Sequence, residues 1–273
     1  MIMQGKKGLV MGVANDRSIA WGIAKKIASE GAEIAFTYQG DALKKRVGPL
    51  ASSIGSSILI PCDVTDSESM TNTFETLKNK WGNIDFLVHC IGFSNKDELR
   101  GKYFNTSSEN FNQTMHISCY SFTEACRLAE PLMNNGGSII TLTYYGSEQV
   151  MPHYNVMGVA KAALEASVRY LAVDMGEKNV RVNAISAGPI KTLAASGIGD
   201  FRFILRWNEL NAPLKRNVSQ EDVGNSALYL LSDLGSAVTG EIQHVDCGYH
   251  TVGMVATDEA KKVSELLDEF CKD

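Results

Sequence analysis

Short apolar segments alternate with longer helical patterns along almost the whole chain of 273 residues. The apolar segments are rich in β-branched residues and are apolar throughout, which is typical of strands buried on both faces. Repeated strand–helix–strand units join parallel strands by right-handed crossovers. We therefore predict one doubly wound α/β sheet of about seven parallel strands with helices on both faces. The expected strands are 8–11, 33–38, 57–61, 86–90, 138–144, 181–185 and 242–246, and the expected helices lie near 18–30, 41–53, 67–81, 108–134, 154–177 and 220–232.

Two regions break this alternation. Residues 190–215 follow the sixth expected strand and are too long for a plain connection. Because ligands bind at the carboxyl edge of a parallel sheet, we expect a helical substrate-binding insertion there. Residues 256–273 form a charged helical pattern, which we interpret as a solvated or frayed tail. The expected organisation is a single domain, 1–255, followed by this tail.

Charge and cysteine content exclude several classes of partner. The chain has 26 Lys and Arg against 31 Asp and Glu, a net charge of −5, which provides no general attraction to nucleic acid or an anionic membrane. Its apolar runs are far shorter than the roughly 18 residues that a transmembrane helix requires. The six cysteines show no metal-ligand spacing. We therefore expect free, mostly buried thiols, no metal and a cytoplasmic location.

The first expected strand leads into a turn that suits a dinucleotide. Gly12 allows a tight turn, and Ser18 can cap the helix that begins near Ile19, whose N-terminal N–H groups bind anions. The pattern is not Gly-x-Gly-x-x-Gly, because Ser18 and Ala20 stand where the later glycines would be. Taken alone, this turn is also compatible with an ordinary capped helix.

Three further strand ends carry residues that fit a dinucleotide. Gln39 could hydrogen-bond the adenosine ribose without charge, and no Arg stands at that strand end, which favours NADH over NADPH. Asp63 can accept a hydrogen bond from the adenine amino group, beside Val64. Gly92, after Ile91, permits close approach of the backbone to the cofactor. Four consecutive strand ends of this kind predict a Rossmann-type NAD-binding site.

A tyrosine and a lysine share one face of the helix expected after the fifth strand. Lys161 follows Tyr154 by seven residues, about 700° of rotation and a rise of ~10.5 Å. The lysine can hold the nicotinamide ribose and lower the pKa of the tyrosine, whose hydroxyl can stabilise an oxyanion. As an isolated pair, these residues would also fit an ordinary amphipathic helix.

Five longer stretches carry a resemblance to a known family: 12–20, 154–161, 181–190, 192–198 and 221–226. Over nearly its whole length the chain resembles the short-chain dehydrogenase/reductase superfamily. More narrowly, it is similar to the NADH-dependent enoyl-acyl-carrier-protein reductases of bacterial fatty-acid synthesis. The resemblance implies reduction of the carbon–carbon double bond of trans-2-enoyl thioesters, with Tyr154, Lys161 and Tyr144 in the catalytic centre.

The catalytic helix departs from most of the superfamily. Most members carry Tyr-x3-Lys, but Met157 stands four residues before Lys161, and Tyr144 holds the usual position of the catalytic serine. The phenol of Tyr154 is thereby displaced by about 4.5 Å along the helix axis. In an enoyl thioester the oxygen to be stabilised lies farther from the nicotinamide than in a ketone, so this displacement favours the enoyl substrate.

The resemblance also implies residues for the rest of the site. Residues expected to border the nicotinamide and pyrophosphate are Ile190, Lys191, Thr192, Leu193 and Ala194. Residues expected to meet the substrate are Phe93, Ser94, Tyr144, Met157, Ala195, Ile198 and Phe201.

The implied partners are an acidic acyl-carrier protein and further copies of the chain in a homotetramer. Arg202 stands where the family receives the carrier protein, but Gly199 and Phe203 replace expected basic residues. Two alternative functions are a short-chain NAD(P)-dependent carbonyl or alcohol dehydrogenase and a non-catalytic dinucleotide sensor. The absence of Tyr-x3-Lys disfavours the first, and a sensor would not need both Tyr154 and Lys161.

Overall fold

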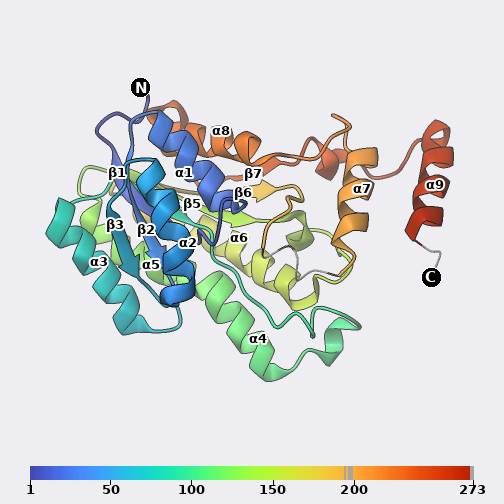
Figure 1. Cartoon of the computed structure of the whole chain (residues 1–273), viewed down its shortest axis with the longest axis horizontal. Helices are drawn as coiled ribbons and strands as arrows, with labels where there is room; N and C mark the ends of the chain where they lie inside the picture. Colours follow the sequence, from blue (N-terminus) through green and yellow to red (C-terminus); the bar gives the residue numbers. More distant parts are fainter. Residues whose placement is uncertain (194, 196–198, 271–273) are drawn as a thin grey trace.

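Parallel strands form one sheet at the centre of the molecule (Figure 1). A computed structural model describes residues 1–193, 195 and 199–270, and residues 194, 196–198 and 271–273 lie outside this description. Within the described residues the sheet has seven strands in the order β3-β2-β1-β4-β5-β6-β7. The predicted number of strands and their parallel pairing are therefore confirmed. The strands are β1 (Lys7–Met11), β2 (Glu33–Tyr38), β3 (Ile58–Pro61), β4 (Phe86–His89), β5 (Gly137–Thr143), β6 (Val180–Ala187) and β7 (Ile242–Val245).

Helices cover both faces of the sheet (Figure 1). They are α1 (Ile19–Ser29), α2 (Gly40–Ser53), α3 (Ser67–Trp81), α4 (Ser108–Met115), α5 (Ser121–Ala129), α6 (Asn155–Gly176), α7 (Phe201–Asn211), α8 (Gln220–Leu231) and α9 (Ala260–Phe270). One apolar layer lies between the sheet and α1, α2 and α8, and the other between the sheet and α3, α5 and α6. Since the strand order reverses between β1 and β4, the ligand crevice is expected at the carboxyl ends of these strands.

The N-terminus of α1 is held in place by close packing against α8. A Cβ added to Gly22 would lie 2.7 Å from the Gln220 Cβ, and one added to Gly224 would lie 3.0 Å from the Gly22 carbonyl oxygen. The side chain of Gln220 donates to the carbonyl oxygens of Asp16 (3.2 Å) and Ser18 (2.6 Å). These contacts fix the turn between β1 and α1, which borders the site described below.

The single helix predicted near 108–134 is interrupted. A π-helical segment, His116–Tyr120, separates α4 from α5. The Ser118 hydroxyl accepts from the Phe93 N–H at 3.0 Å and donates to the Phe93 carbonyl at 3.1 Å. The extra residue of the π turn therefore ties the helix to the loop that follows β4, a long-range contact that helical periodicity does not encode.

The C-terminal segment forms a helix, as predicted, but it is not a frayed end over the described residues. Helix α9 lies beside α7 (Figure 1), and Leu266 is buried. The rings of Phe270 and Phe203 lie 5.5 Å apart, and the Arg202 guanidinium lies over the Phe270 ring. Most side chains of α9 are exposed, as expected of a solvated surface, and its apolar contacts with α7 explain why it is not a frayed end.

The described residues contain no helix that is both long and apolar enough to cross a bilayer. Over the same residues, no group of three or more His, Cys, Asp or Glu side chains is arranged to hold a metal ion. Free thiols in this part of the chain are Cys62, Cys90, Cys119, Cys126 and Cys247.

Candidate active site

A cavity of about 840 Å³ opens at the carboxyl edge of the sheet. Its walls come from the ends of β1, β4, β5 and β6, the start of α1, one face of α6, and α7. The structure thus brings together most of the predicted site residues. Those that line the cavity are Gly12, Ser18, Ile19, Ile91, Gly92, Phe93, Ser94, Tyr144, Tyr154, Met157, Lys161, Ile190, Thr192, Leu193, Ala195 and Phe201.

Other predicted site residues lie elsewhere. Gln39 and Asp63 are outside the cavity lining, and the Gln39 amide donates to the Asp63 carboxylate at 2.9 Å. Val64 is buried in the apolar layer on the α3 side. Lys191 borders a neighbouring cavity together with Arg202 and Arg206. Two further predicted residues, Ala194 and Ile198, lie outside the described residues.

Gln39 and Asp63 still form one polar surface at the ends of β2 and β3. Hydrogen bonds from the Thr65 N–H and hydroxyl lower the pKa of the Asp63 carboxyl, and the Gln39 amide lowers it further. Asp63 is therefore ionised at neutral pH, and both of its carboxylate oxygens can accept a hydrogen bond, as from an adenine amino group.

Ser18 does not cap α1 as predicted. It occupies the position before the helix, but its hydroxyl oxygen accepts from the N–H groups of Ala14 (3.0 Å) and Asn15 (3.1 Å). The hydroxyl thus stabilises the preceding turn and does not compete for the first N–H groups of the helix. Since Ile19 and Ala20 line the cavity, this helix start is suited to bind an anion such as a pyrophosphate.

Two glycines shape the space that a dinucleotide would occupy. Gly12 has φ +95°, and a Cβ there would lie 2.1 Å from the Cys90 carbonyl oxygen, so no larger residue fits. A Cβ on Gly92 would lie 3.8 Å from the Lys161 Nζ and would occupy the space in front of this ammonium. The open backbone, the helix start and the buried lysine fit NAD.

Tyr154 stands immediately before α6 and is 7% exposed. Its neighbours His153 (φ 58°) and Asn155 (φ 35°) both adopt left-handed backbone, which costs of order 1–3 kcal/mol per residue. The His153 ring contacts the Asp200 carboxylate at 2.9 Å, and the Asn155 amide donates to the Gly101 carbonyl at 3.2 Å. Strained backbone on both sides of Tyr154 is typical of a residue whose position matters for function.

The ring of Tyr154 is packed tightly on two sides. The Tyr144 ring meets it edge-on, with centroids 5.1 Å apart and planes at 78°. A Cβ on Gly146 would lie 2.5 Å from the Tyr154 Cδ1 atom, so the backbone of Gly146 lies directly against the ring. The phenol therefore has little freedom to move.

Lys161 is buried, 8% exposed, and its Nζ donates to the Leu142 carbonyl at 2.8 Å. Burial lowers the pKa of its ammonium to about 8, and the acidic groups of Cys90, Cys119 and Glu165 offset part of that effect. Tyr154 and Lys161 line the same cavity, but Tyr154 stands just before α6 and not on the helix face predicted for it.

The predicted lowering of the Tyr154 pKa by Lys161 is wrong in this structure. Burial raises the pKa of the Tyr154 phenol well above its ordinary value, and Tyr144 and Glu165 raise it further. Burial likewise raises the pKa of Tyr144 above its usual range. The desolvation of both phenols outweighs the charge of the lysine.

Several lining residues were not predicted from the sequence, including Leu99, Gln113, Met151, Pro152 and Ile204. Met151 and Pro152 lie in the loop between Tyr144 and Tyr154, and their closeness to both tyrosines could have indicated them. Gln113 lies on α4, and no motif in the sequence indicated that it lines the cavity.

The protein family described as enoyl-(acyl carrier protein) reductase matches residues 12–250. The chain belongs to this family. It is 68% identical over 267 residues to enoyl-[acyl-carrier-protein] reductase [NADH] 1 of Rhizobium meliloti, covering 98% of each chain. It is 60% identical over 252 residues to the NADH enzyme of Rickettsia typhi, covering 92% of this chain and 97% of the relative.

Solved structures agree with this assignment. The enoyl-acyl-carrier-protein reductase of Anaplasma phagocytophilum, determined in complex with NAD, superposes with a TM-score of 0.91 at 62% identity and covers 94% of this chain and 98% of its own. FabI from Candidatus Liberibacter asiaticus superposes with a TM-score of 0.92 at 58% identity, covering 93% and 99%. The expected fold class is therefore confirmed by both topology and superposition.

Proposed function

We propose that Tyr154 and Lys161 carry the chemistry of an enoyl-acyl-carrier-protein reductase in this chain. The enzyme reduces the carbon–carbon double bond of trans-2-enoyl thioesters on acyl-carrier protein with NADH, the last reductive step of fatty-acid elongation. The observation that carries the assignment of residues is the cavity in which Tyr154, Lys161 and the start of α1 meet. Met157 stands where Tyr-x3-Lys would need a phenol, which disfavours a carbonyl dehydrogenase.

The cofactor would be held by residues of the cavity and its adjoining surface. The turn at Gly12 and the first N–H groups of α1 would receive the pyrophosphate. Gln39 and Asp63 would receive the adenosine, and the Lys161 ammonium would hold the nicotinamide ribose hydroxyls. Residues expected to border the cofactor further are Val64, Ile91, Gly92, Ile190, Lys191, Thr192, Leu193 and Ala194.

When bound, NADH supplies the hydride that the β-carbon of the enoyl thioester receives. Negative charge then develops at the thioester oxygen, and the Tyr154 hydroxyl donates a hydrogen bond to it. Because burial raises the pKa of this phenol, Tyr154 stays protonated and able to donate. The α-carbon is afterwards protonated by Tyr154 or by a proton relayed from solvent.

Apolar side chains would enclose the acyl chain. Met157, Ala195 and Phe201 line the cavity, and Phe93 and Ser94 border it beside the cofactor edge. Ile198 is assigned to this wall by the resemblance alone. Tyr144, whose ring packs against Tyr154, would contact the substrate and restrict the phenol.

The carrier protein would dock near the insertion, where basic residues gather. Each of these side chains already pairs with an acid of the same chain: Arg202 with Glu269 (3.8 Å), Arg206 with Glu209 (3.3 Å), Lys215 with Glu259 (3.7 Å) and Arg216 with Asp222 (2.7 Å). The first three pairs are exposed, are worth little and exchange readily, so they leave Arg202, Arg206 and Lys215 available to an acidic partner. Arg216, by contrast, is held by Asp222 through two hydrogen bonds.

The chain would act as a homo-oligomer, by resemblance a tetramer, in the cytoplasm. Helix α6 exposes Val159, Tyr170 and Val173 on one side, and Tyr120 is exposed nearby on the π-helical segment. Apolar side chains gathered in this way favour contact with another copy. Light scattering should report an oligomer that Tyr170→Glu weakens, and a monomeric wild type would contradict the proposal.

The assignment of Tyr154 is tested by following NADH absorbance with a crotonyl thioester and, separately, with a ketone. Tyr154→Phe should lower turnover of the thioester far more than it lowers NADH affinity, because the lost hydroxyl acts on the developing oxyanion. Equal loss of turnover and affinity would contradict the role. Consumption with the ketone alone would indicate the carbonyl dehydrogenase, and consumption with neither would indicate the sensor.

A further inference from the structure

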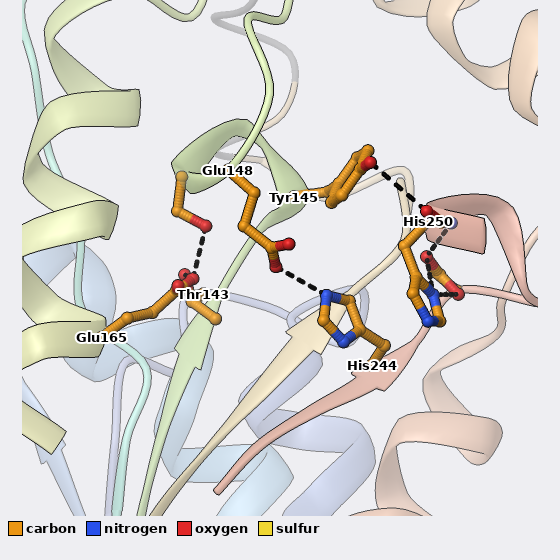
Figure 2. A network of polar contacts seen from close by, with 8 residues as sticks. Thr143, Tyr145, Glu148, Glu165, His244 and His250 are labelled. Atoms are coloured by element: carbon orange, nitrogen blue, oxygen red, sulfur yellow. Dashed lines mark hydrogen bonds and ion pairs between the residues drawn. The ribbon is translucent and has the colours of Figure 1, made fainter. Parts of the chain in front are cut away.

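A buried carboxylate lies directly behind the proposed catalytic pair. Glu165 is one helical turn after Lys161 on α6 and is 7% exposed. One of its oxygens, Oε1, accepts from the Thr143 hydroxyl at 2.6 Å and from the Ser147 hydroxyl at 2.5 Å. Figure 2 shows Glu165 reaching from the helix toward Thr143 at the end of β5. Nothing in the proposed mechanism uses this carboxylate.

The two hydroxyl groups bracket the segment that packs against Tyr154. Thr143 ends β5, and Ser147 ends the 3₁₀ turn Tyr145–Ser147. Between them stand Tyr144, whose ring meets the Tyr154 ring, and Gly146, whose backbone lies against it. One carboxylate therefore fixes both ends of a segment that sets the position of the phenol.

Two further contacts hold this part of the chain on the side away from α6. The Tyr145 hydroxyl donates to the His250 carbonyl at 3.3 Å, and the His244 ring contacts the Glu148 carboxylate at 2.7 Å (Figure 2). These two contacts tie the segment and the residue that follows it to β7 and to the turn Tyr249–Thr251 after this strand. The Glu165 contacts, by comparison, tie it to the helix that carries the catalytic lysine.

We propose that Glu165 is a positioning residue, which aligns the Tyr154 phenol by holding the segment from Thr143 to Ser147 against α6. This inference rests on the proposed function, because it matters only if Tyr154 stabilises the substrate oxygen. A carboxylate suits this role, since a hydrogen bond from a hydroxyl to an ionised acceptor is short and about twice as strong as one to a neutral group.

The charge of Glu165 has a second consequence for Lys161. The titratable groups near the ammonium are His89 and Cys90 at the end of β4, Cys119 from the π-helical segment and Glu165 from α6. The last three raise its pKa against the lowering by burial. Of the three groups that raise the pKa of Lys161, Glu165 is a carboxylic acid and the other two are thiols. Removing its charge lowers the Lys161 pKa further, so the ammonium is lost at a lower pH.

The test compares Glu165→Ala, Glu165→Gln and a matched control, Asp174→Asn, which neutralises an exposed acid on the same helix. Glu165→Ala should lower kcat with a crotonyl thioester by about 10- to 100-fold, the cost of misplacing a catalytic group by up to an ångström, with NADH affinity within about threefold. Glu165→Gln keeps an acceptor oxygen for both hydroxyls and should restore most of kcat. Its NADH binding should, however, fail at a lower pH than in the wild type. Asp174→Asn should leave all three properties unchanged.

A double-mutant cycle with Tyr154→Phe separates this inference from the proposed function. If Glu165 acts through the phenol, Glu165→Ala should cost less than about twofold in the Tyr154→Phe background. The same loss in both backgrounds, or wild-type kcat for Glu165→Ala, overturns the positioning role. If Tyr154→Phe alone keeps full turnover, it is the role of Tyr154 that fails. Should Glu165→Ala not fold, Ser147→Ala removes one of the two contacts, and wild-type kcat in that variant also overturns the proposal.

Discussion

Gly146 is the position at which a single methyl group should displace the catalytic phenol. In Gly146→Ala the new Cβ would lie 2.5 Å from the Tyr154 Cδ1 and 2.8 Å from its Cε1, whereas ordinary contact begins near 3.4 Å. The ring must therefore move by about 0.9 Å, because the other side of the contact is backbone. A shift of about 1 Å can cost about 100-fold in rate, or about 2.7 kcal/mol of transition-state stabilisation.

The expected result is a kcat about 100-fold below wild type with a crotonyl thioester, with NADH affinity nearly unchanged. Stopped-flow absorbance measures the first quantity, and quenching of protein fluorescence by NADH measures the second. Gly176→Ala is the matched control, since a Cβ there meets nothing within 4 Å. A folded Gly146→Ala enzyme with kcat within about twofold of wild type would refute the reasoning, and so would an undiminished effect in the Tyr154→Phe background.

Two further outcomes follow from the structure. Burial lowers the Lys161 pKa to about 8, so the ammonium proposed to hold the ribose is lost above that pH, and the NADH Kd should rise by up to about tenfold per pH unit. Fluorescence titration from about pH 7 to 10 measures this, and a Lys161→Gln variant with the same pH dependence would contradict it. Ending the chain after Ala256 removes the contacts of α9 with α7, so the amide hydrogens of Phe201–Asn211 should exchange faster with solvent. The KM for the enoyl substrate should also rise, because Phe201 and Ile204 line the cavity. Unchanged hydrogen exchange would show that α9 does not support α7.

The sheet was predictable because each strand is a short apolar run between helical patterns. For β6 the prediction covered 181–185 and the strand is Val180–Ala187, an error at the ends that leaves the order of the sheet unchanged. The π-helical segment was not predicted, because the pattern near 108–134 was interpreted as one continuous helix. Ser118 in this segment contacts Phe93, which is remote in the sequence. The position of α9 was missed for a similar reason: Phe203 and Phe270 meet only in the folded chain.

The site residues were predictable where the position of a single residue, at a strand end or relative to a helix, indicates its role. Gly12, Gly92, Tyr154 and Lys161 were found from position and spacing, and all four line the cavity. The hydrogen-bond partners of the side chains were not predictable. The Ser18 hydroxyl could accept hydrogen bonds from N–H groups of the helix or of the preceding turn, and only the folded geometry shows that it accepts from the turn.

The direction of the Tyr154 pKa shift decides what kind of catalyst the phenol can be. Spacing places a positive charge on the same helix face, which alone would favour a phenolate. The structure adds burial, a second buried phenol and the Glu165 carboxylate, and each of these raises the pKa. A phenolate could not donate to an oxygen that is gaining negative charge, whereas a protonated phenol can. The raised pKa keeps the phenol protonated, the state in which it can stabilise an enolate, and in the proposed mechanism the lysine acts on the ribose rather than on the tyrosine. A pH profile of kcat that shows no ionisation of Tyr154 below about pH 10, the ordinary pKa of a phenol, would agree with this division of roles, and a phenolate detected by its absorbance near neutral pH would contradict it.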